Sequence, residues 1–325
     1  MTPHRVAFKQ ILCPTDFSEF SERAFGLAKE IARWSGAHLT ALHAMPPLPP
    51  FLQAGGMMDA PALPMPEGLL REVRSEAARE LQRFVGHPPP LDPPVSTLLL
   101  EGTDAWRQIE AVADALPADL IVMGTHGRSG WNRLVLGSTT EKLIRRALCP
   151  VLTVGEHVSN PVAPHFHRIL CAADLTAASR QTIDLAFAFA EENQAHLTLL
   201  HVVEGGLGAK RVRTGILDSA LEQLHREAAA PHAFCNVATR VETGNAWTEI
   251  LRVAAEARAD LIVLGAHVND AFGRFFLGST ANQVVRHAPC PVLIAREVPA
   301  RARSLERDAG ALSLADGLPA LTGVD

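Results

Sequence analysis

The sequence predicts an α/β fold built twice, as two repeated, doubly wound domains that each hold a five-stranded parallel sheet. Short apolar runs alternate with amphipathic segments in both halves of the chain, which is typical of parallel βαβ units. The run 120–123 contains no polar residue, as expected for a strand that helices cover on both faces. Many residues of the first half also recur in the second half at fixed offsets.

The elements of the first half follow from apolar patterning, with short apolar runs predicting strands and amphipathic stretches predicting helices. The predicted order is strand 8–14, helix 18–35, strand 38–44, helix 67–85, strand 95–100, helix 104–116, strand 120–123, helix 138–147 and strand 151–154. Residues 45–66 are rich in Pro, Gly and Met, so we predict a long loop there. Right-handed crossovers then give an open sheet, whose ligands bind beyond the carboxyl ends of its strands.

The internal repeat sets the domain boundaries. Cys13 recurs as Cys171, at an offset of 158 residues, whereas Gly124 recurs as Gly265, at an offset of 141. The first copy is therefore longer than the second, mainly within the loop at 45–66. We predict a first domain at 5–155, a linker at 156–166, a second domain at 167–297 and a tail at 298–325.

Composition excludes several classes of protein. The net charge is -5 and no run of basic residues occurs, so nothing favours nucleic-acid binding. No apolar run approaches the roughly 18 residues of a membrane span, and no secretory signal is recognisable. The five cysteines contain no C-x-x-C pair, which favours a reducing, cytoplasmic location and buried packing roles.

The segment from Gly124 to Thr139 carries the clearest ligand signal, because it follows a buried strand and leads into a helix. Backbone N–H groups at such a junction can hold phosphate. Glycines allow positive φ and close approach of the ligand, and we expect Ser138 to cap the helix, to contact phosphate, or to do both. The alternative is an ordinary Gly-rich turn. Neither G-x-x-x-x-G-K-[ST] nor G-x-G-x-x-G is present.

The spacing of this segment resembles that of the nucleotide-binding universal stress proteins, which carry G-x2-G-x9-G-[ST]. Gly124, Gly127, Gly137 and Ser138 fit that pattern. The likeness extends to Pro14-Thr15-Asp16-Phe17-Ser18, to Leu42-His43 and to Cys149-Pro150-Val151-Leu152, and it spans both copies. The chain thus looks like a tandem member, and the resemblance implies the Rossmann-like fold of the adenine nucleotide alpha hydrolase class.

The resemblance also implies a site for ATP, with or without Mg, and a role as a stress-response regulatory or sensor module. Asp16 would contact the ribose or its metal, and Ala44 would contact adenine in a pocket lined by Pro14 and Thr15. Main-chain groups of Met123 and Gly124 would frame the base and ribose. The phosphates would be held by Gly127, Gly137, Ser138 and Thr139. The second-copy candidates are Asp174, Val202, Gly265, Gly278 and Ser279.

Other interpretations stay open. One is an enzyme of the related α/β class that cleaves the α–β bond of ATP, although Pro14-Thr15-Asp16 differs from the Ser-Gly-Gly-x-Asp loop of that class. Another is a nucleotide-free scaffold for a protein partner. No catalytic residue is predicted, at most slow ATP hydrolysis is expected, and a metal site is unknown. Asp16 could be a helix-start residue alone, and His43 and His201 read as packed, hydrogen-bonded side chains.

Two expectations concern the relation of the copies. Their last strands would be exposed edges, so we predict that they pair within one chain, as in the resembled family, and homodimer formation is left open. The two pockets are predicted to be unequal because Val268 stands where the first copy has Gly127. If that position needs positive φ, a β-branched residue would be strained there.

Overall fold

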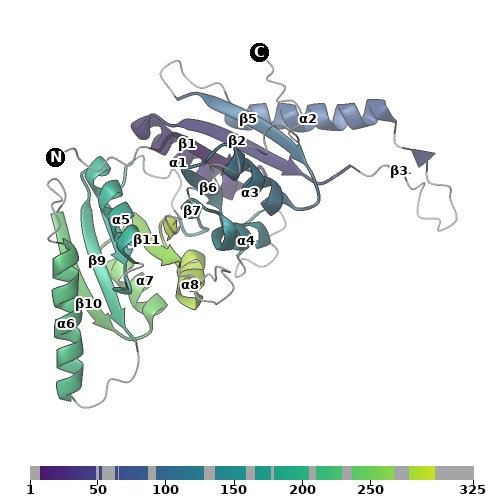
Figure 1. Ribbon diagram of the computed structural model, residues 1–325. Helices are drawn as coiled ribbons and strands as arrows, with labels where there is room; N and C mark the ends of the chain where they lie inside the picture. Colours follow the sequence, from purple (N-terminus) through teal and green to yellow (C-terminus); the bar gives the residue numbers. More distant parts are fainter. Residues whose placement is uncertain are drawn as a thin grey trace.

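The fold is an α/β structure organised around one long sheet (Figure 1). The computed structural model describes residues 8–48, 51–52, 63–64, 66–86, 93–127, 136–158, 165–176, 179–204, 210–228, 236–266 and 278–296. The elements of the first domain are β1 Gln10–Pro14, α1 Glu19–Ser35, β2 His38–Met45, β3 Phe51–Leu52, β4 Leu63–Pro64, α2 Glu67–Val85, β5 Val95–Glu101, α3 Ala105–Ala115, β6 Leu120–Gly124, α4 Ser138–Arg146 and β7 Val151–Val154. The elements of the second domain are β8 Arg168–Ala172, α5 Ser179–Asn193, β9 His196–Val203, α6 Lys210–Ala228, β10 Asn236–Thr243, α7 Ala246–Glu256, β11 Leu261–Ala266, α8 Ser279–His287 and β12 Val292–Arg296.

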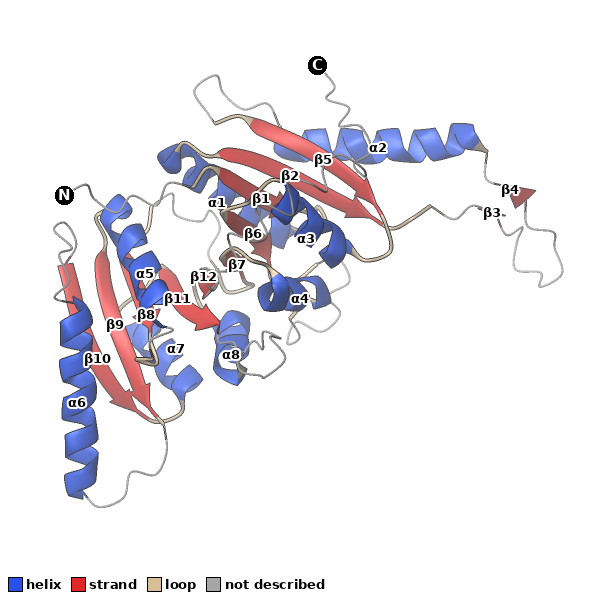
Figure 2. Cartoon of the chain, viewed as in Figure 1, coloured by secondary structure: helices blue, strands red, loops and turns tan. Residues whose placement is uncertain are grey.

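The sheet confirms the predicted doubly wound fold class. Its ten strands run in the order β10-β9-β8-β11-β12-β7-β6-β1-β2-β5 (Figure 2). Within each half all pairings are parallel, and each half holds five strands. The strand order reverses direction between β1 and β6 and between β8 and β11, which is where ligands bind in sheets of this kind.

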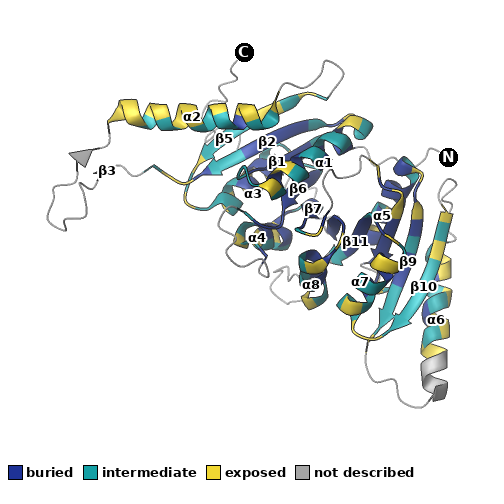
Figure 3. Cartoon of the chain, turned by 180° about the vertical axis from the view of Figure 1, so that it is seen from behind, coloured by how far each residue is buried: buried dark blue, intermediate teal, exposed yellow. Residues whose placement is uncertain are grey.

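Helices cover both faces of each half of the sheet. Neighbouring residues of one strand belong to different cores: Ile11 packs with α1 and α2, whereas Leu12 packs with α3 and α4. This division follows from the alternation of side chains along a strand. The central strands are accordingly buried, and exposed residues gather on the outer sides of the helices (Figure 3).

The two domains join edge to edge, as the sequence predicts. β7 and β12 pair antiparallel, and Leu152 lies opposite Leu293. These leucines are 141 residues apart, so they are equivalent positions on a pseudo-twofold axis. The Thr153 hydroxyl donates to the Val292 carbonyl oxygen at 3.1 Å and reinforces the pairing. Neither strand is therefore left as an open edge.

Arg296 adds a contact between the domains that has no counterpart in the first copy. Its Nη2 donates to the Ile144 carbonyl oxygen at 2.7 Å, and the residue is 4% exposed. Burial lowers the pKa of its guanidinium to about 10, which leaves it charged at neutral pH. The equivalent residue of the first domain is Gly155, where a Cβ would lie 3.7 Å from the Val285 carbonyl oxygen.

Some predictions for the rest of the chain meet the structure only in part. The predicted loop at 45–66 contains a two-stranded antiparallel ribbon, β3 with β4. The tail at 298–325 and Val268 lie outside the described residues. Cys13, Cys149, Cys171 and Cys290 are buried free thiols, as predicted for packing roles, and burial raises the pKa of Cys149 to about 12. In the described part of the chain, no helix combines the length and apolar character that a membrane span requires.

Candidate nucleotide site

The predicted site residues of the first domain gather at one edge of the sheet. Pro14 is the last residue of β1, Ala44 lies near the end of β2, and Met123 and Gly124 end β6. Thr15 follows β1 directly and is buried, and its N–H donates to the Leu42 carbonyl oxygen at 2.8 Å. Parallel strands bring these carboxyl ends together, at the place where such sheets bind ligands.

Asp16 connects this edge to the start of α1. Its Oδ1 accepts from the backbone N–H of Ser18 at 3.1 Å and from the Ser18 hydroxyl at 2.7 Å. Ser18 is in turn the N-cap of α1 and accepts from the Ser21 N–H at 3.4 Å. One carboxylate oxygen therefore shapes the entry to the helix, and this fixes the direction of the other oxygen.

That other oxygen lies against Gly127, in the loop predicted to hold phosphate. A Cβ placed on Gly127 would be 2.5 Å from Asp16 Oδ2, far inside van der Waals contact. Asp16, the residue predicted to contact the ribose, and the second glycine of the motif are thus neighbours in space, although they are 111 residues apart in the sequence. Only glycine allows this approach without moving the carboxylate.

Gly127 does not have a positive φ, so backbone strain is not what makes a β-branched residue unsuitable at this position. Among the described glycines, only Gly36, Gly86 and Gly244 have φ in the left-handed region. The motif glycines are required because neighbouring atoms leave no room for a side chain. A Cβ on Gly124 would lie 2.8 Å from the Phe20 Cβ, and one on Gly137 would lie 3.0 Å from the Thr125 carbonyl oxygen.

Of the two roles considered for Ser138, capping α4 is wrong, and contact with phosphate stays a prediction. Gly137 is the N-cap of α4, Ser138 is the first helical residue, and no side chain caps the helix. The reason lies in the loop, since the Gly137 N–H donates to the Thr125 carbonyl oxygen at 2.9 Å and places Gly137 at the turn. The first-turn N–H groups, including those of Ser138 and Thr139, have no acceptor within the helix. They form the kind of terminus that binds anions.

His43 has the packed, hydrogen-bonded role that the sequence predicts. Its Nδ1 lies 2.7 Å from the Thr15 carbonyl oxygen, which can only accept, so Nδ1 donates. Phe17, with a left-handed φ of 63°, lies over the imidazole with ring centroids 4.3 Å apart. In the second domain, His201 makes the same bond to the Ala173 carbonyl oxygen at 2.8 Å.

Two threonines that hold the loop were missed from the sequence. The buried Thr140 hydroxyl donates to the Gly124 carbonyl oxygen at 3.0 Å. The Thr125 hydroxyl lies 2.8 Å from Nδ1 of His126. At the offset of 141 their counterparts are Ala266 and Ala281, so a comparison of the two copies could have found them.

The acidic residue of the second domain keeps the two bonds that Asp16 makes, because Thr176 is equivalent to Ser18, and it gains a third bond. Oδ1 of Asp174 accepts from the N–H of Thr176 at 3.0 Å, from the Thr176 hydroxyl at 2.8 Å, and from the Ser179 hydroxyl. In the first domain the equivalent serine, Ser21, receives the hydroxyl of Thr15 at 3.1 Å instead. Because Ala173 replaces Thr15, Ser179 turns to the carboxylate.

The remaining candidates of the second domain keep their places in the fold. Val202 lies on β9 and Gly265 on β11, both toward the carboxyl ends of these strands. Gly278 is the N-cap of α8, and Ser279 is its first residue, without a side-chain cap. The second domain therefore repeats the framework of the site with fewer hydroxyl contacts.

Thr140→Val is expected to lower the free energy of unfolding by about 1–3 kcal/mol, because the buried Gly124 carbonyl oxygen loses its hydroxyl donor. Denaturant unfolding measures the change. Thr139→Val is the matched control. It makes the same substitution one residue earlier, and the Thr139 hydroxyl does not make the bond to the Gly124 carbonyl oxygen. Equal stability of the two variants would contradict the role assigned to Thr140.

Comparison with known proteins decides the family. The sequence profile of the Universal stress protein family matches the chain twice, over residues 7–155 and 165–296. The chain belongs to the universal stress protein family. As a tandem member, this universal stress protein carries two copies of the family's domain within one continuous sheet.

Relatives of this universal stress protein occur in several organisms. One copy is 37% identical, over 147 residues, to a universal stress protein of Thermus aquaticus, covering 45% of this chain and 98% of the relative. A universal stress protein of Methanocaldococcus jannaschii is 34% identical over 147 residues, with coverage of 45% and 82%. The crystal structure of a universal stress protein from Archaeoglobus fulgidus shares the fold, with a TM-score of 0.63, 21% identity, and coverage of 89% of this chain and 96% of that one.

Proposed function

We propose that this protein binds an adenine nucleotide, ATP or a close relative, mainly through its first domain, and works as a regulatory or sensor module in the stress response. The observation that carries the proposal is the approach of Gly127 to Asp16 Oδ2. It joins the residue proposed for the ribose to a loop that leads into the N-terminus of α4, which no side chain caps. Ribose and phosphate contacts then lie along one edge of the sheet.

The site fits magnesium only as a companion of the nucleotide. In the described parts of the chain, no cluster of three or more His, Cys, Asp or Glu side chains is arranged to hold a metal ion. Mg²⁺ is commonly bound by one or two carboxylates together with substrate phosphates. Asp16 would supply the carboxylate, and the ion would balance phosphate charge near Gly127 and α4.

Binding rather than turnover is the activity that the site supports. Two polar side chains in the described part of the site are held by structural hydrogen bonds: Asp16 to Ser18, and His43 to the carbonyl oxygen of Thr15. Neither stands in an arrangement of base and nucleophile. We therefore expect at most slow hydrolysis of ATP. We also propose a cytoplasmic location, because a reducing compartment suits the buried free thiols.

Mass spectrometry of nucleotide released from the purified, denatured protein tests the proposal. We expect ATP or a related adenine nucleotide at about one equivalent per chain. Added ATP at 100 times its Kd should stabilise the fold by about 2.7 kcal/mol. Absence of both nucleotide and stabilisation would contradict the proposal and favour a scaffold. Release of pyrophosphate with AMP would instead favour the ATP-cleaving class.

A further inference from the structure

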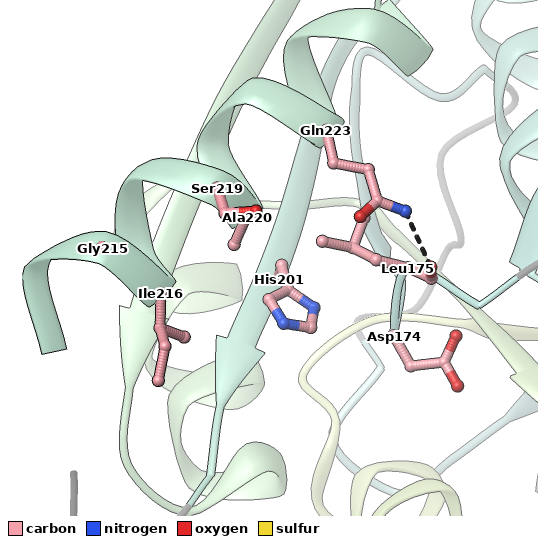
Figure 4. Close-up of a pocket in the computed structure, with 8 residues that line it drawn as sticks. All are labelled: Asp174, Leu175, His201, Gly215, Ile216, Ser219, Ala220 and Gln223. Atoms are coloured by element: carbon pink, nitrogen blue, oxygen red, sulfur yellow. Dashed lines mark hydrogen bonds between the residues drawn. The ribbon is translucent and has the colours of Figure 1, made fainter. Parts of the chain in front are cut away.

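A cavity in the second domain adjoins the proposed nucleotide edge and shares one residue with it, Asp174. It has a volume of ≈ 500 Å³ and lies between α6 and the ends of β8 and β9 (Figure 4). His201 of β9 lines it together with Asp174 and Leu175 of the loop after β8. From α6 it is lined by Ile216, Ser219 and Gln223. Its size is typical of sites for small organic molecules.

The first domain fills the equivalent space with aromatic rings. There the ring of Phe17 lies on His43 at 4.3 Å, and Phe84 of α2 packs on Phe17 at 5.7 Å. The residue equivalent to Phe17 is Leu175, at the offset of 158. The second domain thus keeps the histidine and lacks the ring that covers it.

The helix that lines the cavity, α6, also lacks an aromatic ring that α2 carries in the first domain. α2 and α6 are both 19 residues long, and their buried leucines, Leu81 and Leu224, are equivalent. By this alignment Phe84 of α2 corresponds to Glu227, whose carboxylate pairs with Arg180 at 3.3 Å. The second ring is therefore missing as well. Ser219 stands where α2 carries a longer glutamate, Glu76.

The walls of the cavity are held in place. The His201 ring is fixed by the bond from its Nδ1 to the Ala173 carbonyl oxygen at 2.8 Å. Nε2 of Gln223 donates to the Leu175 carbonyl oxygen at 2.8 Å, which ties α6 to the loop after β8. Ile216, a large apolar side chain that is 40% exposed, lies at the surface beside these groups. An imidazole face, an apolar side chain and polar side chains thus surround one space.

We propose that this cavity binds a planar nitrogen heterocycle of nucleobase size, which stacks on His201 in the place that Phe17 takes on His43. The hydroxyl of Ser219 and the amide of Gln223 offer hydrogen bonds to the heterocycle's polar edge. The cavity shares Asp174 with the proposed nucleotide edge, but it lies on the other side of the sheet from the proposed adenine contact at Val202, because neighbouring residues of β9 face opposite sides. Val202 packs against the core that α7 and α8 cover.

Adenine, as the free base, is the probe that tests the site, with chemical shifts of ¹³C-labelled histidine side chains as the readout. We expect adenine to shift the His201 signal in the full-length protein, whereas cyclohexanol, of similar size but not planar, should not. Leu175→Phe copies the first domain and should weaken this binding at least about tenfold. Ser219→Glu should weaken it too, and it copies a residue that α2 already carries.

Gly127→Val separates this proposal from the one for the first domain. In that variant, adenine should still shift His201, and ATP binding to the first domain should be lost. An adenine response that vanishes in Gly127→Val but persists in Leu175→Phe would overturn the cavity proposal and leave the nucleotide proposal intact. No adenine response at His201 in the wild type would also overturn it. Failure of ATP to bind, beside a normal His201 response, would contradict only the proposed function.

Discussion

Gly127→Val is expected to remove tight ATP binding from the chain. A side chain at this position would start 2.5 Å from Asp16 Oδ2, so the carboxylate and the loop cannot both keep their places. Loss of one or two charge-assisted contacts, at about 1.5–3 kcal/mol each, weakens ATP roughly 10- to 10,000-fold. Titration calorimetry on the full-length protein measures the affinity and the number of sites.

Two further variants make this result specific. Gly68→Val is the matched control, because a Cβ at Gly68 of α2 meets nothing within 4 Å, and its ATP affinity should be unchanged. Val268→Gly restores the motif glycine of the second copy and should gain affinity if that residue limits the second site. The wild type should show about one tight site. Two equal sites, or full ATP affinity in Gly127→Val, would contradict this interpretation.

The second copy has lost more than one glycine, and this supports unequal sites. The hydroxyls of Thr125 and Thr140, which bind within the phosphate loop of the first domain, correspond to Ala266 and Ala281. The carboxylate of Asp174 also accepts from an additional serine. Val268→Gly alone should therefore restore binding only in part, because these hydrogen bonds remain absent.

Leu152→Pro is expected to open the contact between the two domains. β7 lies between β6 and β12, so a proline in it removes a backbone donor from a strand that is paired on both sides. Leu152 is also fully buried opposite Leu293, and its loss leaves a gap at the pseudo-twofold axis. Small-angle scattering should show a larger radius of gyration, and thermal unfolding should begin at a lower temperature.

Leu152→Ala separates the packing of the Leu152 side chain from the backbone pairing of β7 with β12. It should destabilise the protein by about 2–5 kcal/mol, as expected for a truncated core leucine, and keep the scattering envelope. If Leu152→Pro does not fold, Arg296→Gly offers a milder test, because it copies Gly155 and removes the bond to the Ile144 carbonyl oxygen. Full stability and an unchanged scattering envelope in both Leu152→Pro and Arg296→Gly would show that the pairing of β7 with β12 does not hold the domains together.

The sequence by itself determined the fold class, the repeat and the family. Apolar periodicity is local, so it predicted α2 at 67–85 and β7 at 151–154 with the bounds that the structure has. The exposed-edge argument predicted the pairing of β7 with β12, because an unpaired strand edge is a general liability. Equivalent residues at two offsets gave the repeat without any coordinates.

Only the tertiary structure explained why the candidate site needs these residue types at these positions. Gly127 has no positive φ, and a side chain is excluded there because Asp16, remote in sequence, lies beside it. Ser138 was expected to cap α4, to contact phosphate, or to do both, and the bond from Gly137 to Thr125 excludes the cap because it sets the turn one residue earlier. The cavity at His201 depends on rings that are missing from two separate elements. Each of these features is a contact between distant segments, and local patterns carry no information about such contacts until the chain has folded.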